Sequence, residues 1–343
     1  SGRLIAVLTR VFGMRNLDLA EDVVQACLVE ALETWSLAGI PDNPSGWLFR
    51  VARNRGLDAL RRQGNALRLA TEVAASGGDD ARSTFDEFAL EGEISDAQLR
   101  MMFACCDPDL PPRSRVALTL NTLCGFSPRE IAAAFLSIEE TVRKRLTRAK
   151  KTLRERGDVD VPVGEALRPR LDDLHQVLYL LFNEGYNSSH PDRLIRKELC
   201  QEAVRLCQLL TQHPVCTTPA SWALLALMLL HAARLDARVN EQGDLILLAE
   251  QDRSRWDQRL IAAGLRALDR SASGDDASPY HLEAGIAAHH CLSPSFEQTD
   301  WSSILQHYDM LMQRSPSPVV ALNRAIVLAE LCGPEQGLHA IHA

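Results

Sequence analysis

The feature that most constrains the fold of this chain is a pair of helix-start signals near its middle. Ser127 is followed three residues later by Glu130, which is the capping-box pattern at the beginning of a helix. Ser137 can cap a second helical stretch, which opens with two acidic residues that favour the positive end of a helix dipole. The sequence therefore predicts a short helix over residues 128–135, a tight turn, and a longer helix over residues 139–156.

The longer of these helices has one apolar stripe on an otherwise basic surface. Val142, Leu146, Ala149 and Leu153 recur at the spacing of one helix face, so we expect them to be buried. Residues 143–156 contain eight Lys and Arg against one Glu. A solvated surface helix also carries such residues, because both are good helix formers, but this imbalance exceeds what solubility requires. The pattern is typical of a helix-turn-helix, whose second helix enters the DNA major groove.

A second basic cluster lies in a segment that we predict to be a helix from about Ser45. Trp47 stands near its start, after a loop that contains Pro and Asn. Because bases stack on aromatic rings while phosphates contact Arg, this combination favours single-stranded nucleic acid. The alternative is that Trp47 is a core residue. Helical spacing places five polar side chains on one face: Arg50, Arg53, Asn54, Asp58 and Arg61.

Apolar residues recur at helical spacing along most of the chain, and no stretch has a convincing strand pattern. We therefore predict an all-α protein with two small helical modules, residues 1–62 and 97–157, an acidic linker at 63–96, and a helical domain at 166–343. The final stretch of that domain resembles one tetratricopeptide-type helix pair, whereas closing a repeat core takes about three units. Within the domain we expect helices at 168–184, 192–212, 219–234, 252–269, 279–291, 300–313 and 317–331.

The charge of the chain is distributed unevenly. The net charge of −8 alone argues against a nucleic-acid partner. Residues 1–157, however, hold 22 Lys and Arg against 21 Asp and Glu, while residues 158–343 hold 15 against 24. The acidity is therefore concentrated in the C-terminal half, which could hold the basic helices of the same chain when no other partner is present.

Little in the sequence indicates catalysis or metal binding. The nine Cys are odd in number and no signal-peptide pattern precedes them, which favours reduced thiols in the cytoplasm. No CxxC or HxxxH spacing supports a zinc site, and the most apolar run, residues 220–233, fits a buried core helix rather than a membrane span. We expect no cofactor, no metal and no enzymatic activity. A helical enzyme would have to use scattered residues that share no motif spacing: His175, Glu184, His231 and His281.

Three motifs, taken in order, resemble the extracytoplasmic-function (ECF) group of bacterial RNA polymerase sigma factors, small members of the sigma-70 family. Residues 19–25 resemble region 2.2, and residues 47–54 with 58–62 resemble regions 2.3 and 2.4. Residues 125–132 with 140–149 resemble region 4.2. The strings at 180–186 and 250–256 are similar to the C-terminal extension of one ECF group, in which that extension is tetratricopeptide-like.

This resemblance implies two partners, core RNA polymerase (β′ clamp and β flap) and promoter DNA. Asp22 and Gln25 would contact the clamp helices of the β′ subunit, loop 38–46 would hold a flipped −10 base, and the linker would thread through polymerase. The opened −10 strand would follow Trp47, Arg50, Arg53, Asn54, Arg61 and Arg62. The −35 element would be read by Arg129, Thr141, Arg143, Lys144, Arg145 and Arg148.

The role of the C-terminal domain stays open between two hypotheses. It regulates the sigma modules by packing on them or on polymerase, or it binds a peptide or small molecule in a helical groove. Its polar and aromatic strings could equally cap helices and form buried pairs: Asn183, Glu184, Tyr186, Asp252, Arg253, Arg255 and Trp256. For the whole chain, a helix-turn-helix regulator with a sensory domain is the alternative to a sigma factor.

Overall fold

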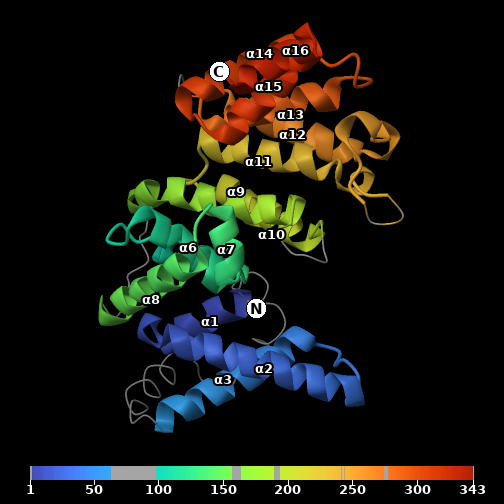
Figure 1. Ribbon diagram of the computed structural model, residues 1–343. Coiled ribbons are helices and arrows are strands. Elements are labelled where there is room, and N and C mark those ends of the chain that lie inside the picture. Colours follow the sequence, from blue (N-terminus) through green and yellow to red (C-terminus); the bar gives the residue numbers. More distant parts are fainter. Residues whose placement is uncertain are drawn as a thin grey trace. The chain divides into compact units, whose positions relative to one another are not determined.

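A computed structural model describes residues 2–62, 98–156, 164–188, 194–240, 242, 244–273 and 277–342. The described residues form helices and no β-strand, apart from one isolated bridge between Val239 and Leu245, so the all-α prediction is confirmed. The predicted acidic linker at 63–96 lies outside the described residues. The chain is divided into two compact units, Ser1–Val177 and Leu178–Ala343 (Figure 1).

The first unit begins with three helices that pack on one another: α1 (Gly2–Phe12), α2 (Leu17–Ala38) and α3 (Pro44–Arg62). Phe12 is buried at their meeting point, and α3 approaches it through Gly56. A Cβ built on Gly56 would stand 2.1 Å from the Phe12 ring, so only glycine permits this approach. Asn16 precedes α2, and Asp18 lies in its first turn.

The helix-turn-helix consists of α6 (Pro112–Cys124), α7 (Pro128–Ala134) and α8 (Glu139–Arg156). The predicted capping box is present: the Ser127 side chain accepts from the Glu130 N–H, and the Glu130 carboxylate accepts from the Ser127 N–H. The predicted stripe of α8 is buried as expected. Ser137 does not cap α8, because Ile138 directly precedes that helix and the Ile138 carbonyl accepts from the Thr141 and Val142 N–H groups.

The two groups of helices contact each other within the first unit. Helix α1 packs on α6, and α8 packs on η1 (Met14–Asn16). The turn η3 (Gly164–Arg170) and the first half of α9 (Leu171–Tyr186) belong to the same unit. The divide therefore falls inside α9, because Arg170 and Asp173 hold this segment to the helix-turn-helix side.

In the second unit, consecutive helices pack on one another around α11 (Figure 1). By length and composition, Pro219–Ala237 could cross a membrane, but 72% of that window is buried, as in the core helix of a soluble protein. Two helices were predicted to begin too early: residues 252–257 hold a 3-10 turn capped by Asp252 and the Asp257 cap of α12, and the helix predicted from residue 192 begins at Lys197. The helices are α10 (Lys197–Gln212), α11 (Pro219–Ala232), α12 (Gln258–Ser271), α13 (Pro279–Leu292), α14 (Trp301–Arg314), α15 (Pro318–Cys332) and α16 (Pro334–His342), with the short turns η4 (Leu235–Ala237), η5 (Leu248–Glu250) and η6 (Arg253–Arg255).

Candidate nucleic-acid interface

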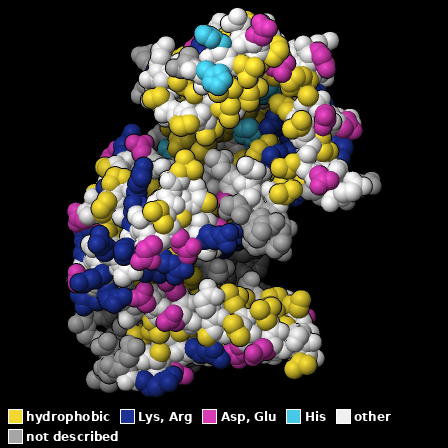
Figure 2. Space-filling view, viewed as in Figure 1, with side chains coloured by type: hydrophobic (Ala, Val, Ile, Leu, Met, Phe, Trp, Pro, Cys, Tyr) yellow, Lys and Arg dark blue, Asp and Glu magenta, His cyan; other side chains and the backbone are white. Residues whose placement is uncertain are grey.

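The N-terminal half of α8 presents cations to solvent. Figure 2 shows Lys and Arg side chains gathered over the region of α8. Thr141, Arg143, Lys144 and Arg148 are exposed, and Arg129 is exposed on the preceding helix α7. Within the described part of the chain, Arg143 and Lys144 pair only with Glu139 and Glu140, one turn earlier on the same surface. Such exposed pairs contribute about 1 kcal/mol or less, so DNA can displace them at little cost.

Arg145 differs from the other predicted −35 residues. Its side chain is half-buried, and its Nη1 atom is fully buried with no hydrogen-bond partner among the described residues. Arg145 lies at the edge of the outer face of α8, beside the buried stripe. Helical spacing alone did not distinguish this edge from the rest of the outer face. One edge of the Arg145 guanidinium is therefore turned away from solvent.

Cationic side chains in the C-terminal half of α8 form ion pairs with carboxylates of the same protein. Lys150 pairs with Glu21 of α2 at 2.5 Å, and both side chains are 19% exposed. Arg154 pairs with Asp18, one turn earlier on α2. The acids that meet α8 here therefore come from α2, a relation that sequence reasoning missed because these residues are about 130 positions apart along the chain.

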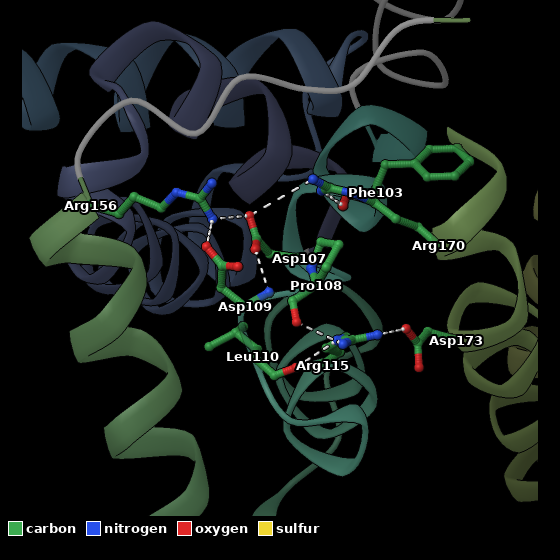
Figure 3. A network of polar contacts seen from close by, with 9 residues as sticks. All are labelled: Phe103, Asp107, Pro108, Asp109, Leu110, Arg115, Arg156, Arg170 and Asp173. Atoms are coloured by element: carbon green, nitrogen blue, oxygen red, sulfur yellow. Dashed lines mark hydrogen bonds and ion pairs between the residues drawn. The ribbon is translucent and has the colours of Figure 1, made fainter. Parts of the chain in front are cut away.

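A buried polar network fixes the far end of α8 (Figure 3). Asp107 is 2% exposed and accepts from Arg156 at 2.7 Å, while Arg170 of η3 lies 3.8 Å away. Arg170 also donates to the Phe103 carbonyl at 2.6 Å. One buried carboxylate thus joins the end of the basic helix to the segment that leads into α9.

A second pair extends this network towards α9. Arg115 of α6 donates to Asp173 at 2.6 Å, and neither side chain is more than 15% exposed. The same guanidinium donates to the carbonyls of Leu110 and Pro108, at 2.7 and 2.9 Å. Every nitrogen of Arg115 is used, so the base of the helix-turn-helix is held rigidly.

The second predicted DNA surface lies on α3. Its cations alternate with the buried positions Ala52, Gly56 and Leu60, so the two sets occupy different faces. Arg53 is half-buried, and Arg61 pairs with Asp58 at 3.2 Å in an exposed pair. The remaining predicted polar residues of this surface are all exposed: Arg50, Asn54, Arg61 and Arg62.

Trp47 agrees in part with both interpretations made from the sequence, a base-stacking residue and a core residue. It is half-buried, and its ring meets the Trp35 ring edge-on, with centroids 5.5 Å apart. The preceding loop turns at Gly39, whose φ of 82° suits glycine, and the Asn43 side chain accepts from the Gly46 N–H at 2.7 Å. One edge of Trp47 is therefore fixed by packing against Trp35, while the residue stays partly exposed.

An apolar surface follows the predicted polymerase contacts along α2. Asp22 and Gln25 are exposed, and the same helix continues with Val29 and Leu32, which are 55% and 74% exposed. Figure 2 shows hydrophobic side chains at the surface over the region of α2. Contiguous exposed apolar residues with a polar margin are typical of protein–protein contacts.

The other candidate residues have structural roles. Among the described residues, none of the nine Cys forms a disulfide, and no group of three or more His, Cys, Asp or Glu could hold a metal. His281 accepts from the Ser278 N–H at the start of α13, and Glu184 lies 3.8 Å from Arg196. Burial lowers the pKa of His175 to about 4. His231 and Tyr186 both lie beside Arg234, whose Nη2 atom is 3.1 Å from His231 Nδ1 and 2.6 Å from the Tyr186 hydroxyl.

Three family models match the chain in succession. Sigma-70 region 2 matches residues 1–66, and sigma-70 region 4 matches residues 101–153. A family of unknown function, DUF6596, matches residues 170–272. The first two matches include every predicted DNA-binding and polymerase-binding residue, and the third covers the beginning of the C-terminal extension.

Relatives among known proteins agree with these matches. An uncharacterized protein of Rhizobium meliloti (strain 1021) is 37% identical over 97% of this chain and 78% of its own length. The ECF RNA polymerase sigma factor SigL of Mycobacterium tuberculosis is 31% identical over 39% of this chain and 72% of its own length. The probable RNA polymerase sigma factor RfaY of Xanthomonas campestris is 31% identical over 41% of this chain and 34% of its own length.

No solved structure matches the chain. The alternative of a helix-turn-helix regulator with a sensory domain does not account for the region 2 match, whereas a sigma factor accounts for both modules and their order. The chain belongs to the ECF group of the sigma-70 family of RNA polymerase sigma factors, and it carries a helical C-terminal extension.

Proposed function

We propose that this protein binds core RNA polymerase in the cytoplasm and directs it to promoters by reading a −35 element with α8 and a −10 element with α3. The observation that carries the proposal is the exposed cationic half of α8, where Arg143, Lys144 and Arg148 project from a helix held by its buried stripe. In this proposal the sigma factor recognises the promoter, and the polymerase carries out the polymerisation chemistry.

The −35 contact requires only duplex recognition. The first turns of α8 would enter the major groove, where Thr141 and Arg143 reach base edges and Arg148 contacts phosphate. Arg129 on α7 would contact the backbone beside the groove. We assign Arg145 a smaller part in this contact than its charge suggested, because one of its guanidinium nitrogens is buried.

The −10 contact requires unpaired bases. Extruding a base costs a few kcal/mol, which a pocket and stacking contacts must offset. The loop before α3 is exposed at Ile40 and fixed at Asn43, and it leads directly to Trp47. We propose that this loop holds the flipped base while Arg50, Asn54 and the cations at the end of α3 follow the strand.

Core binding would use the exposed surface of α2. Asp22 and Gln25 supply polar contacts, and Val29 and Leu32 supply the apolar centre that a stable interface needs. The β′ clamp would be the partner of this surface, and the β flap would be that of the region 4 module. The direct test is run-off transcription with the full chain and core polymerase on promoter libraries, and the lack of both core binding and promoter-dependent transcripts would contradict the proposal.

Replacing Leu32 with glutamate should weaken core binding at least tenfold, because a charge would be buried in the apolar centre of the interface. Affinity for core polymerase, measured by fluorescence anisotropy, checks this. Leu322→Glu is the matched control, since Leu322 is also an exposed leucine but lies on α15. Equal core affinity of the two variants would remove α2 from the interface.

We propose that the C-terminal extension modulates these contacts, with a protein or an intramolecular partner. The structure indicates where a truncation that tests this role must end. A deletion from residue 160 would remove Asp173 and Arg170, the partners of the helix-turn-helix module. A truncation after Val177 keeps them, and unchanged DNA binding and transcription by that truncated protein would contradict a modulatory role.

A further inference from the structure

Three arginines meet in the second unit without a carboxylate partner among the residues that the structure describes. Arg234 and Arg238 flank η4, and Arg253 begins η6; we refer to them as the arginine cluster. Arg234 is 7% exposed. Across the described residues of Leu178–Ala343, no member of the cluster forms an ion pair. An arginine side chain keeps its charge at any physiological pH, so burial without an anion is costly.

The acids that are nearest in sequence are engaged elsewhere. Asp236, inside η4, pairs with Lys197 of α10. Asp252, next to Arg253, is solvent-exposed and accepts from the N–H and hydroxyl of Ser254. Glu297, also solvent-exposed, exerts only a weak attraction on Arg253. The protein therefore does not neutralise the cluster with its own described carboxylates.

Aromatic rings and carbonyls satisfy part of each guanidinium. Arg234 donates to the Tyr186 hydroxyl at 2.6 Å, and the Arg238 guanidinium lies over the Tyr186 ring, 3.6 Å from its centroid. Arg253 donates to the carbonyls of His290 and Ser293, at 2.6 and 2.7 Å. These contacts explain why the arginines tolerate burial, but they leave the positive charge in place.

Four buried nitrogens beside these contacts have no hydrogen-bond partner in the described part of the chain: Arg234 Nε, Arg253 Nη2, Trp256 Nε1 and His290 Nδ1. The Trp256 ring lies beside two of the arginines, with its centroid 4.6 Å from Arg253 Cζ and 5.7 Å from Arg234 Cζ. His290 is more than nine-tenths buried, and burial with the charges of Arg234 and Arg253 lowers its pKa to about 3. His290 is thus neutral near pH 7 and adds no positive charge.

Arginine and tryptophan nitrogens can only donate, so three of the four unpartnered atoms require an acceptor. An acceptor that also carries negative charge would satisfy the donors and the uncompensated charge together. Each of these nitrogens exposes less than 1 Å² of surface, so bulk water does not fill that role. The site is closed, and an entering ligand would displace neighbouring side chains.

We propose that the arginine cluster, with Trp256 and His290, is a binding site for a small oxyanion, a phosphate or carboxylate group of a small-molecule ligand. Residues 170–272, the segment matched by the family of unknown function, contain all three arginines and Trp256. The site lies wholly within the second unit, so it does not depend on the proposed promoter and polymerase contacts. Through it, the extension would sense a ligand.

The test titrates the full chain with sodium phosphate, and separately with sodium acetate, against sodium chloride at equal ionic strength. Thermal unfolding and tryptophan fluorescence are the readouts. We expect a saturable rise in melting temperature with at least one of the two oxyanions, because a ligand of the folded state alone stabilises it. The anion with the lower half-saturation concentration assigns the group as phosphate or carboxylate.

Variants separate a site from the general stabilising effect of phosphate on proteins. Trp256→Phe keeps the ring under both guanidiniums and loses one donor, so half-saturation should rise about tenfold. Arg234→Met should abolish saturation. Arg270→Met is the matched control, since Arg270 lies 4.7 Å from the Trp222 ring but is solvent-exposed, and it should titrate like the unaltered chain. Absence of saturation by both anions, or identical titrations for Trp256→Phe and the unaltered chain, would overturn the proposal.

Discussion

Replacing Asp107 with alanine is expected to destabilise the first unit by about 3 kcal/mol, because removing one partner of a buried ion pair leaves the other charge uncompensated. Asp107 is 2% exposed and is shared by Arg156 and Arg170. Without it, the Arg170 guanidinium, itself 11% exposed, keeps only the Phe103 carbonyl. The end of α8 would lose its anchor at the same time.

Asp109 provides the control for this prediction. It pairs with the same Arg156, at 2.8 Å, but is 68% exposed, so Asp109→Ala should cost about 1 kcal/mol or less. Hydrogen exchange of the α6 and α8 amides, followed in urea, reports on the first unit without interference from the second. Similar losses for the two variants would show that burial of Asp107 is not what stabilises this network.

Replacing Arg143 and Arg148 together with alanine is expected to lower holoenzyme affinity for its −35 element about 100-fold. Each base or phosphate contact of this kind contributes about 1–3 kcal/mol. Neither residue packs in the core, so the fold should persist. Binding of the holoenzyme to a −35 duplex, measured by fluorescence anisotropy over a range of salt, also tests the salt dependence, which should become shallower because fewer counterions are released.

Lys151→Ala is the matched control on the same helix. Lys151 is exposed and pairs with Glu155 at 3.6 Å, but it lies beyond the turns that would enter the groove. We expect its replacement to change affinity much less than the double substitution. If Lys151→Ala weakens binding equally, α8 acts as a general cationic surface and does not read the −35 element with its first turns.

Local patterns predicted the helices well because their causes are local. The capping box at Ser127 and the stripe of Val142, Leu146, Ala149 and Leu153 depend on residues within a few turns, and both are present. Ser137 failed as a cap because Ile138, one residue later, directly precedes α8, and the Ile138 carbonyl accepts from the Thr141 and Val142 N–H groups. A local signal of this kind indicates where a helix starts only to within a residue or two.

Long-range contacts could not be predicted in the same way. The sequence marked α8 as uniformly basic, but Lys150 and Arg154 meet acids of α2 while Arg143 and Arg148 do not. Likewise, Arg253 and Trp256 were singled out as a string, without any sign that Arg234 would lie beside the same ring. The positions of these residues along the chain carry no information about which of them become neighbours.

The pairing of α8 with α2 gives ionic strength two opposing effects on promoter binding. Salt screens the contact between α8 and DNA phosphates, but it also screens the Arg154–Asp18 pair, which is about half-exposed. The Lys150–Glu21 pair is mostly buried and would resist screening. Moderate salt would therefore weaken the Arg154–Asp18 pair within the protein as well as the contact between α8 and DNA. The affinity for promoter DNA would consequently depend less on salt than the charge of α8 alone suggests.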